Sequence, residues 1–436
     1  MREQRVKEVV DADGVAHRAS EAGHRRGLET IFGTVTVTRL AYRATGQENL
    51  HLGDAALNLP RERHSHGLRE RCALEATRGS YDEARDALLR ATGVGIGKRQ
   101  VEELARRAAT DVEAYYDHAS RDPTAATGAL VISADGKGIV MRPDALRAQT
   151  RRAAAFASHK LATRLSKGEK RDRKRLAELA VVYDCPPVPR TPADIFAGED
   201  EARPEAPKAH SKWLTASVVD DVREVIAKAF CEAERRDPDH TRPVVALVDG
   251  NNHQIDRIRT EAKKRSLDVT VVVDFVHVLE YLWAAAWCFF PEGDSAAEEW
   301  VAAKGIAILE GKAGVVAGAI RRKATMLGLD TAQRKRADEC ARYLKNKADC
   351  LDYPTALANG WPIATGVIEG ACRHLVKDRF DLTGARWSLE GAEAMLKLRA
   401  VRTNGDWPEY WNYHLAEEHR RVHASRYANG VIPMAA

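Results

Sequence analysis

Two apolar, β-branched runs in this chain each end in an aspartate, and they constrain its fold more than any other feature. Leu130–Ala134 leads directly to Asp135, and Val244–Val248 leads directly to Asp249. Short apolar runs of this composition are typical of buried strands. Helix-patterned segments separate the strand-like runs, which predicts an α/β fold with a mixed sheet. Functional groups of such sheets gather at strand ends, so both aspartates are candidate site residues.

Three further segments have strand character. Ile139–Met141 follows Asp135-Gly136, and an Asp-Gly pair between two apolar runs predicts a hairpin. Leu179–Tyr183 is a third strand candidate, and Val269–Val273 leads to Asp274. Between them, residues 193–211 are rich in Pro, Glu and Ala, which indicates a surface excursion before a helix at about 216–235. From about 279 to 357 the pattern is wholly helical, which predicts an inserted helical block.

The N-terminal part predicts a β-ribbon followed by helices. Thr30–Arg43 is rich in β-branched and aromatic residues and predicts one or two strands. Helical patterns cover 68–77, 81–91 and 98–116, with the glycine-rich break Gly93–Gly97 before the third. This arrangement suits a helix-turn-helix unit, and a helical linker with a glycine turn is the alternative. A phosphate-binding loop is excluded, because it would need glycine at Thr92 and a hydroxyl at Arg99.

Composition places the chain in the globular class. It has 436 residues, of which 44% are hydrophobic and 30% charged. The first residues lack an apolar signal region, and the sequence has no run of about 18 apolar residues, so we expect neither secretion nor membrane insertion but a cytoplasmic protein. Its seven cysteines form no Cys-x-x-Cys pair, which predicts reduced thiols and no structural zinc.

Positive charge is concentrated in one segment. Residues 147–175 contain eleven lysines and arginines against two acids, a local charge of +9 in a chain whose net charge is +5. Such a basic arm attracts the phosphate backbone of nucleic acid by releasing counterions. A solvated helix or loop face is the alternative interpretation.

A third acid, Glu369, lies in a helix-patterned segment far downstream. On an α-helix, Glu369 would share one face with Arg373 and Lys377, while Ile368, Cys372, Leu375 and Val376 would turn toward the core. An ordinary surface ladder of ion pairs would have the same pattern. Together with Asp135 and Asp249, however, Glu369 could hold two Mg²⁺ ions, which favour carboxylate ligands and support phosphodiester chemistry.

Several motifs in order give the chain a family resemblance. They are Asp135-Gly136-Lys137-Gly138, Val248-Asp249-Gly250-Asn251, Asp274-x-x-His277-Val278-Leu279-Glu280, Gly366-Val367-Ile368-Glu369-Gly370-Ala371-Cys372-Arg373-His374, Gly384-Ala385-Arg386-Trp387 and Asn404-Gly405-Asp406-Trp407. From about Gly128 to its C-terminus the chain resembles bacterial insertion-sequence transposases of the ISKra4 family. The resemblance implies an RNase H-like core whose DDE triad corresponds to Asp135, Asp249 and Glu369. It also implies a helical insertion before the glutamate, as in Mutator-like and hAT transposases.

Two smaller motifs have two interpretations each. Asp274-Phe275-Val276-His277 resembles the [Cys/Asp]-x-x-His element of that wider group, which gives Asp274 and His277 a supporting role near the site. His277 could instead be a satisfied interior histidine. Arg386 could contact phosphate while Trp387 stacks on an unpaired base, or Trp387 could be a packing residue before a Ser388-capped helix.

The expected function is that of a DNA transposase that cleaves and joins strands with two Mg²⁺ or Mn²⁺ ions. Its partners would be double-stranded DNA, as terminal inverted repeats and target, and further copies of the chain in a homo-oligomer on DNA, associated with the nucleoid. The expected DNA contacts are Lys137, Arg171, Arg173, Lys174, Arg175, Arg373, Lys377, Arg386 and Trp387. The alternatives are a catalytically inactive, transposase-derived DNA-binding protein and a carboxylate hydrolase such as a glycosidase.

This interpretation divides the chain into five parts. They are a β-ribbon region (1–60), a helix-turn-helix-like DNA-binding domain (61–126), the first part of the catalytic core with its basic arm (127–278), the helical insertion (279–362), and the core completion with C-terminal helices (363–436). Because no separate DNA-binding module precedes the ribbon, we also expect that the chain begins inside a longer ancestral reading frame.

Overall fold

The chain forms two compact units, each assembled from separate segments. The structure is a computed structural model that describes residues 5–119, 128–156, 161, 169, 173–198, 203–382 and 384–433. Unit 1 comprises 1–120, 140–174 and 378–436, and unit 2 comprises 121–139 and 175–377. The sequence interpretation kept 363–436 together as one part, whereas the units divide it at Asp378.

Unit 2 is built on a five-stranded mixed sheet with the strand order β7-β6-β5-β8-β9. The strands are β5 (Ala129–Val140), β6 (Lys174–Cys185), β7 (His210–Ser217), β8 (Val244–Val248) and β9 (Val269–Val273). β5, β8 and β9 run parallel, while β6 and β7 are antiparallel to each other. The predicted α/β class with a mixed sheet is confirmed.

The predicted hairpin at Asp135-Gly136 is wrong, because β5 continues through both residues as one strand. Gly136 does not have a positive φ angle. A Cβ at this position would lie 2.9 Å from Leu176 Cδ2 of the neighbouring strand β6. The glycine therefore makes room for close strand packing and does not form a turn.

β7 was not predicted, and the helix after it begins later than expected. Helix α8 spans Val222–Arg236, whereas the sequence pattern placed its start near Ala216. Asp221 is its N-cap, and the Glu224 side chain accepts a hydrogen bond from the Asp221 backbone N–H at 2.8 Å. This capping box fixes the helix start and leaves the preceding residues free to pair with β6.

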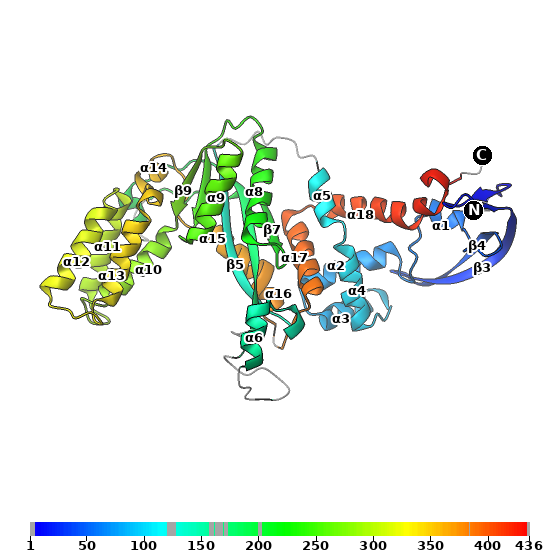
Figure 1. Ribbon diagram of the computed structural model, residues 1–436, viewed down its shortest axis with the longest axis horizontal. Coiled ribbons are helices and arrows are strands. Elements are labelled where there is room, and N and C mark those ends of the chain that lie inside the picture. The colour runs from blue at the N-terminus through cyan, green and yellow to red at the C-terminus, as the bar shows by residue number, and fades with distance from the viewer. Residues whose placement is uncertain are drawn as a thin grey trace. The chain divides into compact units, whose positions relative to one another are not determined.

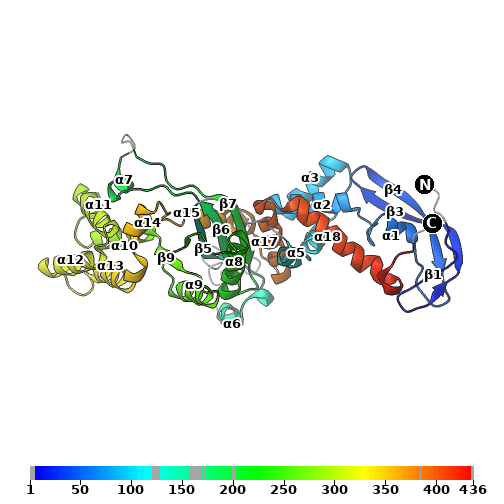
Figure 2. The same cartoon turned by 90° about the horizontal axis from the view of Figure 1, so that it is seen from above.

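Helices cover the sheet and continue into a helical block. α8 contacts β7, and α9 (Asn252–Lys264) contacts β8 and β9, as Figures 1 and 2 illustrate. As predicted, the elements from 275 to 358 are all helical. They are α10 (Phe275–Ala286), α11 (Ser295–Leu309), α12 (Ala313–Met326), α13 (Lys335–Asn346), η3 (Ala348–Cys350) and α14 (Tyr353–Ala358). The short helix α7 (Pro192–Phe196) lies between β6 and β7 in sequence, and α15 (Gly366–Ala371) continues into the π-helix η4 (Cys372–Lys377).

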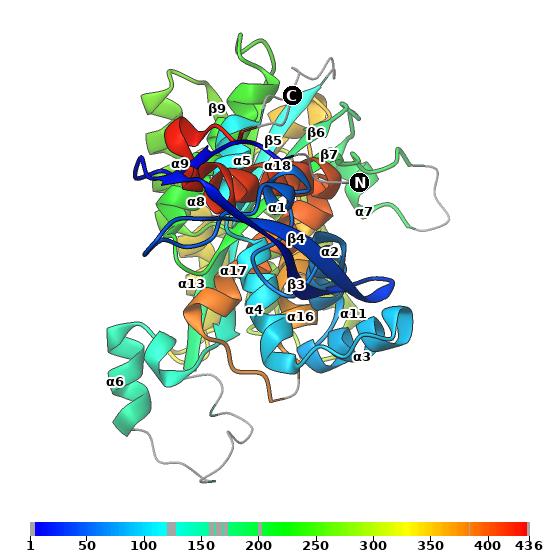
Figure 3. The ribbon, with the colours of Figure 1, turned by 90° about the vertical axis from the view of Figure 1, so that its right-hand side faces the viewer.

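Unit 1 begins with a small strand pair and a long twisted ribbon, best seen in Figures 2 and 3. The pair is β1 (Val9–Val10) with β2 (Ala16–His17), and the ribbon is β3 (Ala19–Thr30) with β4 (Gly33–Arg43). The sequence pattern covered β4 and missed β3, whose polar and glycine-containing residues lack strand character. At its base, the ribbon buries Leu40 and Tyr42 against Val9 and Tyr427, which joins the two ends of the chain in one small core.

The other elements in the described residues of unit 1 are helices. Its helices are α1 (Leu52–Ala56), α2 (His66–Arg78), α3 (Tyr81–Thr92), α4 (Lys98–Ala108), α5 (Val112–His118), η1 (Pro143–Ala145), α6 (Ala148–Phe156), α16 (Asp378–Phe380), α17 (Leu389–Asn404), α18 (Trp407–Val422), η5 (Ala424–Arg426) and η6 (Ala428–Gly430). α2, α3 and α4 contact one another, α17 packs on α2 and α4, and α18 packs on α5. In place of the single helix predicted over 98–116, the structure has two helices, α4 and α5. In the described part of the chain, no helix is both long and apolar enough to cross a membrane.

Helices α2 and α18 share a buried ionic network with the start of α5. Arg69 is 3% exposed and donates a 2.5 Å hydrogen bond to Glu418. His414 Nδ1 lies 2.6 Å from Asp111 Oδ2, and Arg421 donates to both oxygens of Asp111 at 2.6 and 2.8 Å. The network therefore ties residues far apart in sequence by charge-assisted bonds within unit 1.

Acidification is expected to destabilise unit 1, because four of its buried or half-buried histidines favour the neutral form. The pKa values of His51, His64, His66 and His423 are all lowered from the ordinary value of 6.5, chiefly by burial. Above pH 6.5 these histidines are neutral in both states, and the fold keeps its full stability. As the pH falls below 6.5, the unfolded chain binds more protons than the folded one, so the free energy of unfolding decreases. Thermal unfolding at pH 7.5, 6.5 and 5.5 and constant ionic strength should give a falling Tm. A Tm that rose or stayed constant over this range would contradict the expectation.

Candidate active site

Three aspartates of unit 2 lie at one level of three adjacent parallel strands. Ser133 of β5 is in register with Leu247 of β8, so Asp135 is level with Asp249. Val248 is in register with Val273 of β9, so Asp249 is level with Asp274. Parallel strands with matched registers bring their carboxyl ends to the same sheet edge. The strand pairing therefore places these aspartates at the same level of the sheet.

Asp135 is half-buried, and both its oxygens have partners. Oδ1 accepts a hydrogen bond from the Gly136 backbone N–H at 2.6 Å, and Oδ2 accepts one from the Cys372 thiol at 3.2 Å. Burial raises the pKa of the Cys372 thiol, and the charges of Asp135 and Glu369 raise it further. Cys372 is thus a protonated donor at neutral pH, and it links Asp135 to the segment that carries Glu369.

Asp249 is exposed in the turn between β8 and α9. Its Oδ1 accepts a hydrogen bond from the Asn251 N–H at 2.8 Å, and Asn251 in turn caps α9 by accepting from the His253 N–H at 3.0 Å. The backbone carbonyl of Asp249 accepts a 3.2 Å hydrogen bond from the hydroxyl of Tyr343, on α13 of the helical block. The helical block therefore helps to fix the turn that presents Asp249.

Gly250 is required in this turn for two reasons. Its φ is +96°, and an added Cβ would lie 2.5 Å from the Tyr343 hydroxyl oxygen. We expect Gly250→Ala to lower the free energy of unfolding by about 2–4 kcal/mol, from left-handed strain and overpacking together. Gly293→Ala is the matched control, since Gly293 has a φ of +83° with no atom within 4 Å of the added Cβ. It should cost only about 1–2 kcal/mol.

Urea unfolding of the two alanine variants measures this difference. Tyr343→Phe in the Gly250→Ala background removes the overlapping oxygen and should recover most of the excess over Gly293→Ala. Equal losses for Gly250→Ala and Gly293→Ala would show that the Tyr343 contact does not constrain the turn.

Glu369 is exposed on α15, and its Oε1 accepts a 3.0 Å hydrogen bond from the Thr365 hydroxyl. As predicted, Ile368, Cys372, Leu375 and Val376 are buried, while Arg373 and Lys377 are exposed. The regular α-helical spacing is not kept, because η4 is a π-helix from Cys372 to Lys377. Each π-turn takes in an extra residue, and such turns recur at functional sites. Glu369, Arg373 and Lys377 therefore do not follow the regular α-helical spacing from which a common face was predicted.

Asp274 and His277 differ sharply in environment. Asp274 is 2% exposed and caps α10, accepting from the Val276 N–H at 2.8 Å. Its other oxygen accepts from the Thr365 N–H at 3.3 Å and also contacts the Thr365 hydroxyl. The His277 side chain is 36% exposed and lies 3.0 Å from Glu280, so this residue is not a fully interior histidine. Asp274 thus contacts the base of the Glu369 helix, whereas His277 is half-buried beside Tyr343.

The predicted DNA contacts are distributed over both units. In unit 2, Lys137, Arg373 and Lys377 are exposed, and Arg175 donates a 2.8 Å hydrogen bond to the Val218 carbonyl. In unit 1, Lys174 and Arg386 are exposed and Arg173 is half-buried. Arg147, Arg151 and Arg152, at the start of the basic arm, are also exposed. Arg171 lies outside the described residues.

Trp387 matches the packing alternative. It is 6% exposed, and its ring centroid lies 4.5 Å from that of Phe380 and 5.9 Å from that of Tyr81. The Arg379 guanidinium lies 4.7 Å from its centroid. Its backbone bridges to Met141, so the ring is enclosed within unit 1. Stacking on an unpaired base would require this residue to leave its core.

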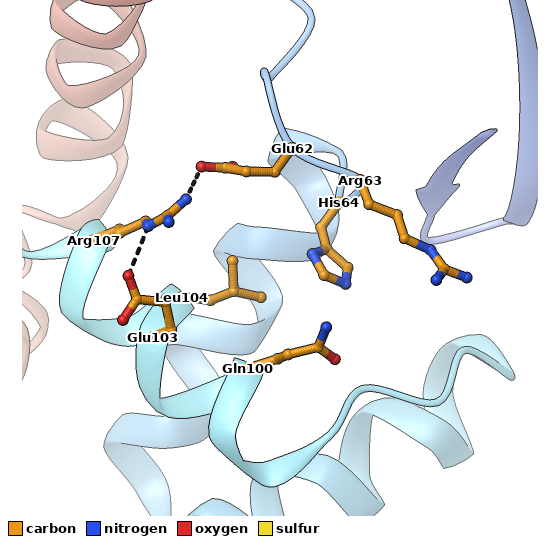
Figure 4. A pocket seen from close by; sticks show the side chains of 7 residues that line it. All are labelled: Glu62, Arg63, His64, Gln100, Glu103, Leu104 and Arg107. Carbon is orange, nitrogen blue, oxygen red and sulfur yellow. Dashed lines mark hydrogen bonds and ion pairs between the residues drawn. The ribbon is translucent and has the colours of Figure 1, made fainter. Parts of the chain in front are cut away.

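Unit 1 has hollows of its own, lined in part by α4. One of them, of about 240 Å³, is lined by Glu62, Arg63, His64, Gln100, Glu103, Leu104 and Arg107 (Figure 4). In it, Arg107 is paired with both Glu62 and Glu103. A second, of about 310 Å³, is lined by Arg99, Glu102, Glu103, Arg106, Arg142, Ser388 and Glu390. The cations of α4 in these hollows largely face acids, so their charge is partly neutralised.

Sequence reasoning missed three residues that hold the acids in place: Thr365, Cys372 and Tyr343. Thr365 and Cys372 lie four residues before and three after Glu369, and this helical spacing was a usable signal. Tyr343 had no signal, because only the folded helical block brings it to Asp249.

The donor set of the three acids fits a hard divalent cation, which prefers carboxylate oxygens. Within the described residues, no group of three or more His, Cys, Asp or Glu side chains is arranged to hold a metal ion. Ligation by Asp135, Asp249 and Glu369 would therefore require their side chains to turn toward one another. In comparisons with known proteins, no protein-family model matches the chain, and no curated protein shows significant similarity to it.

Proposed function

We propose that this protein is a DNA transposase of the DDE type, which binds terminal inverted repeats and catalyses metal-dependent strand cleavage and strand transfer. The observation that carries the proposal is the common level of Asp135 and Asp249 on adjacent parallel strands. Glu369 belongs to the same constellation, because Cys372 of its helical segment hydrogen-bonds to Asp135. The sequence resemblance to ISKra4-family transposases assigns the same three residues.

We further propose that the sheet of unit 2 is an RNase H-like core. In support, the first acid lies on the central strand of a five-stranded mixed sheet, and the second follows the adjacent parallel strand. A block of helices separates β9 from the glutamate, as the resemblance implies. Fold and site thus support the same assignment.

Asp135, Asp249 and Glu369 would hold Mg²⁺ or Mn²⁺. When bound, two such ions activate the attacking water or 3′-hydroxyl and stabilise the charge that develops on the leaving oxygen. The protein's own contribution is to present carboxylates at a surface that DNA can reach, since Asp249 and Glu369 are exposed. The exposed cations Lys137, Arg373 and Lys377, from the segments that carry Asp135 and Glu369, would contact the phosphate backbone.

Unit 1 would recognise the DNA ends. Helices α2, α3 and α4 contact one another, and the Gly93–Gly97 turn precedes α4, as in a helix-turn-helix unit. Arg99 and Gln100 at the start of α4 are exposed, whereas Lys98 is paired with Asp82. The exposed Arg147, Arg151 and Arg152 would add backbone contacts.

The direct test uses DNA that flanks the gene, in which imperfect inverted repeats are expected. The protein should bind these repeats and nick them at the element ends with Mg²⁺ or Mn²⁺, but not with EDTA. Its affinity should fall steeply with salt, because DNA binding releases counterions. Binding without nicking would favour the inactive DNA-binding descendant. Weak binding that does not respond to salt would favour a carboxylate hydrolase, which would use paired acids on an uncharged substrate.

A further inference from the structure

Thr365 lies between two carboxylates, at the point where the helical block returns to the sheet. It is 5% exposed, and its hydroxyl oxygen is within hydrogen-bonding distance of Asp274 Oδ2 and, at 3.0 Å, of Glu369 Oε1. A hydroxyl has a single hydrogen to donate. Thr365 can therefore donate to Asp274 or to Glu369, but not to both at once.

The two carboxylates differ in freedom. Asp274 is buried, and backbone N–H groups of Val276 and Thr365 hold its two oxygens. Its own N–H donates to the Val248 carbonyl at 2.8 Å, which anchors it to β8 beside Asp249. Glu369 is exposed. Asp274 is thus the fixed partner of the hydroxyl, and Glu369 is the movable one.

Cys372 lies in the same helical segment as Glu369 and forms a hydrogen bond with another carboxylate, that of Asp135. Its side chain is buried, and the thiol donates to Asp135 Oδ2 at 3.2 Å. Thr365 and Cys372 lie on either side of Glu369 in sequence. Thr365 contacts Asp274 and Glu369, and Cys372 contacts Asp135. The segment 365–372 therefore joins Asp135, Asp274 and Glu369 through two small, buried donors.

We propose that Thr365 and Cys372 are positioning residues, which set the carboxylates of Glu369 and Asp135 for the reaction. The inference rests on the proposed function. When the hydroxyl donates to Glu369, it holds that carboxylate at the base of its helix. Without that bond the exposed Glu369 carboxylate loses the restraint that sets its orientation, whereas Asp274 keeps its two backbone N–H donors. Outer residues of this kind typically change metal affinity or activity by about 10–100-fold when they are mutated.

The test compares variants that keep or remove the donor. Thr365→Val preserves shape and removes the hydroxyl, and Thr365→Ser keeps it. Cys372→Ala and Cys372→Ser form the second pair. Nicking of the terminal-repeat DNA should fall by about 10–100-fold in Thr365→Val and Cys372→Ala, and the serine variants should stay within about threefold of wild type. DNA affinity should be unchanged in all four, since neither side chain is exposed.

A second readout does not depend on metal or on activity. In a crystal structure of metal-free Thr365→Val, the Glu369 carboxylate should leave its place beside residue 365, and in Thr365→Ser it should stay. Equal losses of nicking in the valine and serine variants would overturn the inference, as would an unmoved Glu369 in Thr365→Val. If Thr365→Val fails to fold, the Cys372 pair decides by the same criterion.

Different results would overturn the positioning role and the proposed function. A Thr365→Val protein that nicks like an active wild type would overturn the positioning role and leave the proposed function standing. A folded wild-type protein that binds the repeats but never nicks them, with either metal, would overturn the proposed function and the positioning role together.

Discussion

Asp249→Asn protein is expected to bind terminal-repeat DNA with wild-type affinity and to have lost its metal-dependent nicking. Asparagine keeps the size of the side chain and the oxygen that accepts the hydrogen bond from the Asn251 N–H, so the turn and the start of α9 should persist. What it removes is one of three carboxylate charges that would hold the cations. The loss should exceed about 100-fold, because outer residues around metal ligands already cost 10–100-fold.

Asp256→Asn is the matched control for Asp249→Asn. Asp256 is exposed on α9, the helix that follows the same turn, and Asp256→Asn likewise removes one negative charge. Its nicking rate and DNA affinity should stay close to wild type. Nicking measured on end-labelled repeat DNA, with a gel-shift titration in parallel, separates chemistry from binding. Undiminished nicking by Asp249→Asn would disprove the triad.

Arg69→Met is expected to destabilise unit 1 by about 3–5 kcal/mol, the typical cost of removing one partner of a buried ion pair. Arg69 is 3% exposed, and its loss leaves Glu418 without its strongest donor. The Glu418 side chain is itself only 9% exposed, and among the described residues its Oε2 has no hydrogen-bond partner, only the longer contacts to His66 and His414. Methionine fills much of the arginine's volume, so the loss reports the uncompensated charge more than a cavity.

Arg78→Met on the same helix α2 provides the control. Arg78 pairs with Glu75, but its side chain is 56% exposed, and exposed pairs contribute at most about 1 kcal/mol. Chemical unfolding followed by circular dichroism measures both variants. If Arg69→Met costs no more than Arg78→Met, the buried network does not stabilise unit 1.

Fold prediction from this sequence worked where burial was two-sided and failed where it was not. The runs before Asp135, Asp249 and Asp274 are apolar apart from Ser133 and Thr270, because most residues of β5, β8 and β9 are buried, and all three runs were found. β7 begins with the polar residues His210, Ser211 and Lys212, and β3 is largely exposed, so neither has the apolar run on which recognition depended. The Asp-Gly signal in β5 failed because a central strand obtains its hydrogen bonds from neighbours on either side, whatever local turn its residues favour.

For the candidate site, the sequence predicted the acids but not what holds them. Asp135 and Asp249 stood out because a charged residue directly after an apolar strand is a local pattern. Their common level depended on strand register, which is a property of pairing. Tyr343 and Asp249 are 94 residues apart, and only the packing of the helical block decides that they meet. For Trp387 the sequence left two interpretations open, since an aromatic residue beside an arginine has the same local pattern on a DNA-binding surface and in a core, and burial favours the core.

The two ends of the chain share the small core in which Val9, Tyr42 and Tyr427 are buried, and this has a consequence for the order in which the protein can fold. Unit 2 lies between the first and last segments of unit 1 in the sequence. During synthesis at about 5–20 residues per second, the N-terminal ribbon and helices would therefore wait roughly 15–60 s for the helices that complete their packing. Unit 2 can mature first, on the ribosome, while the N-terminal segment remains exposed to chaperones. A gene fragment that ends near residue 120 would lack the helices of 378–436, so its product would stay incompletely packed.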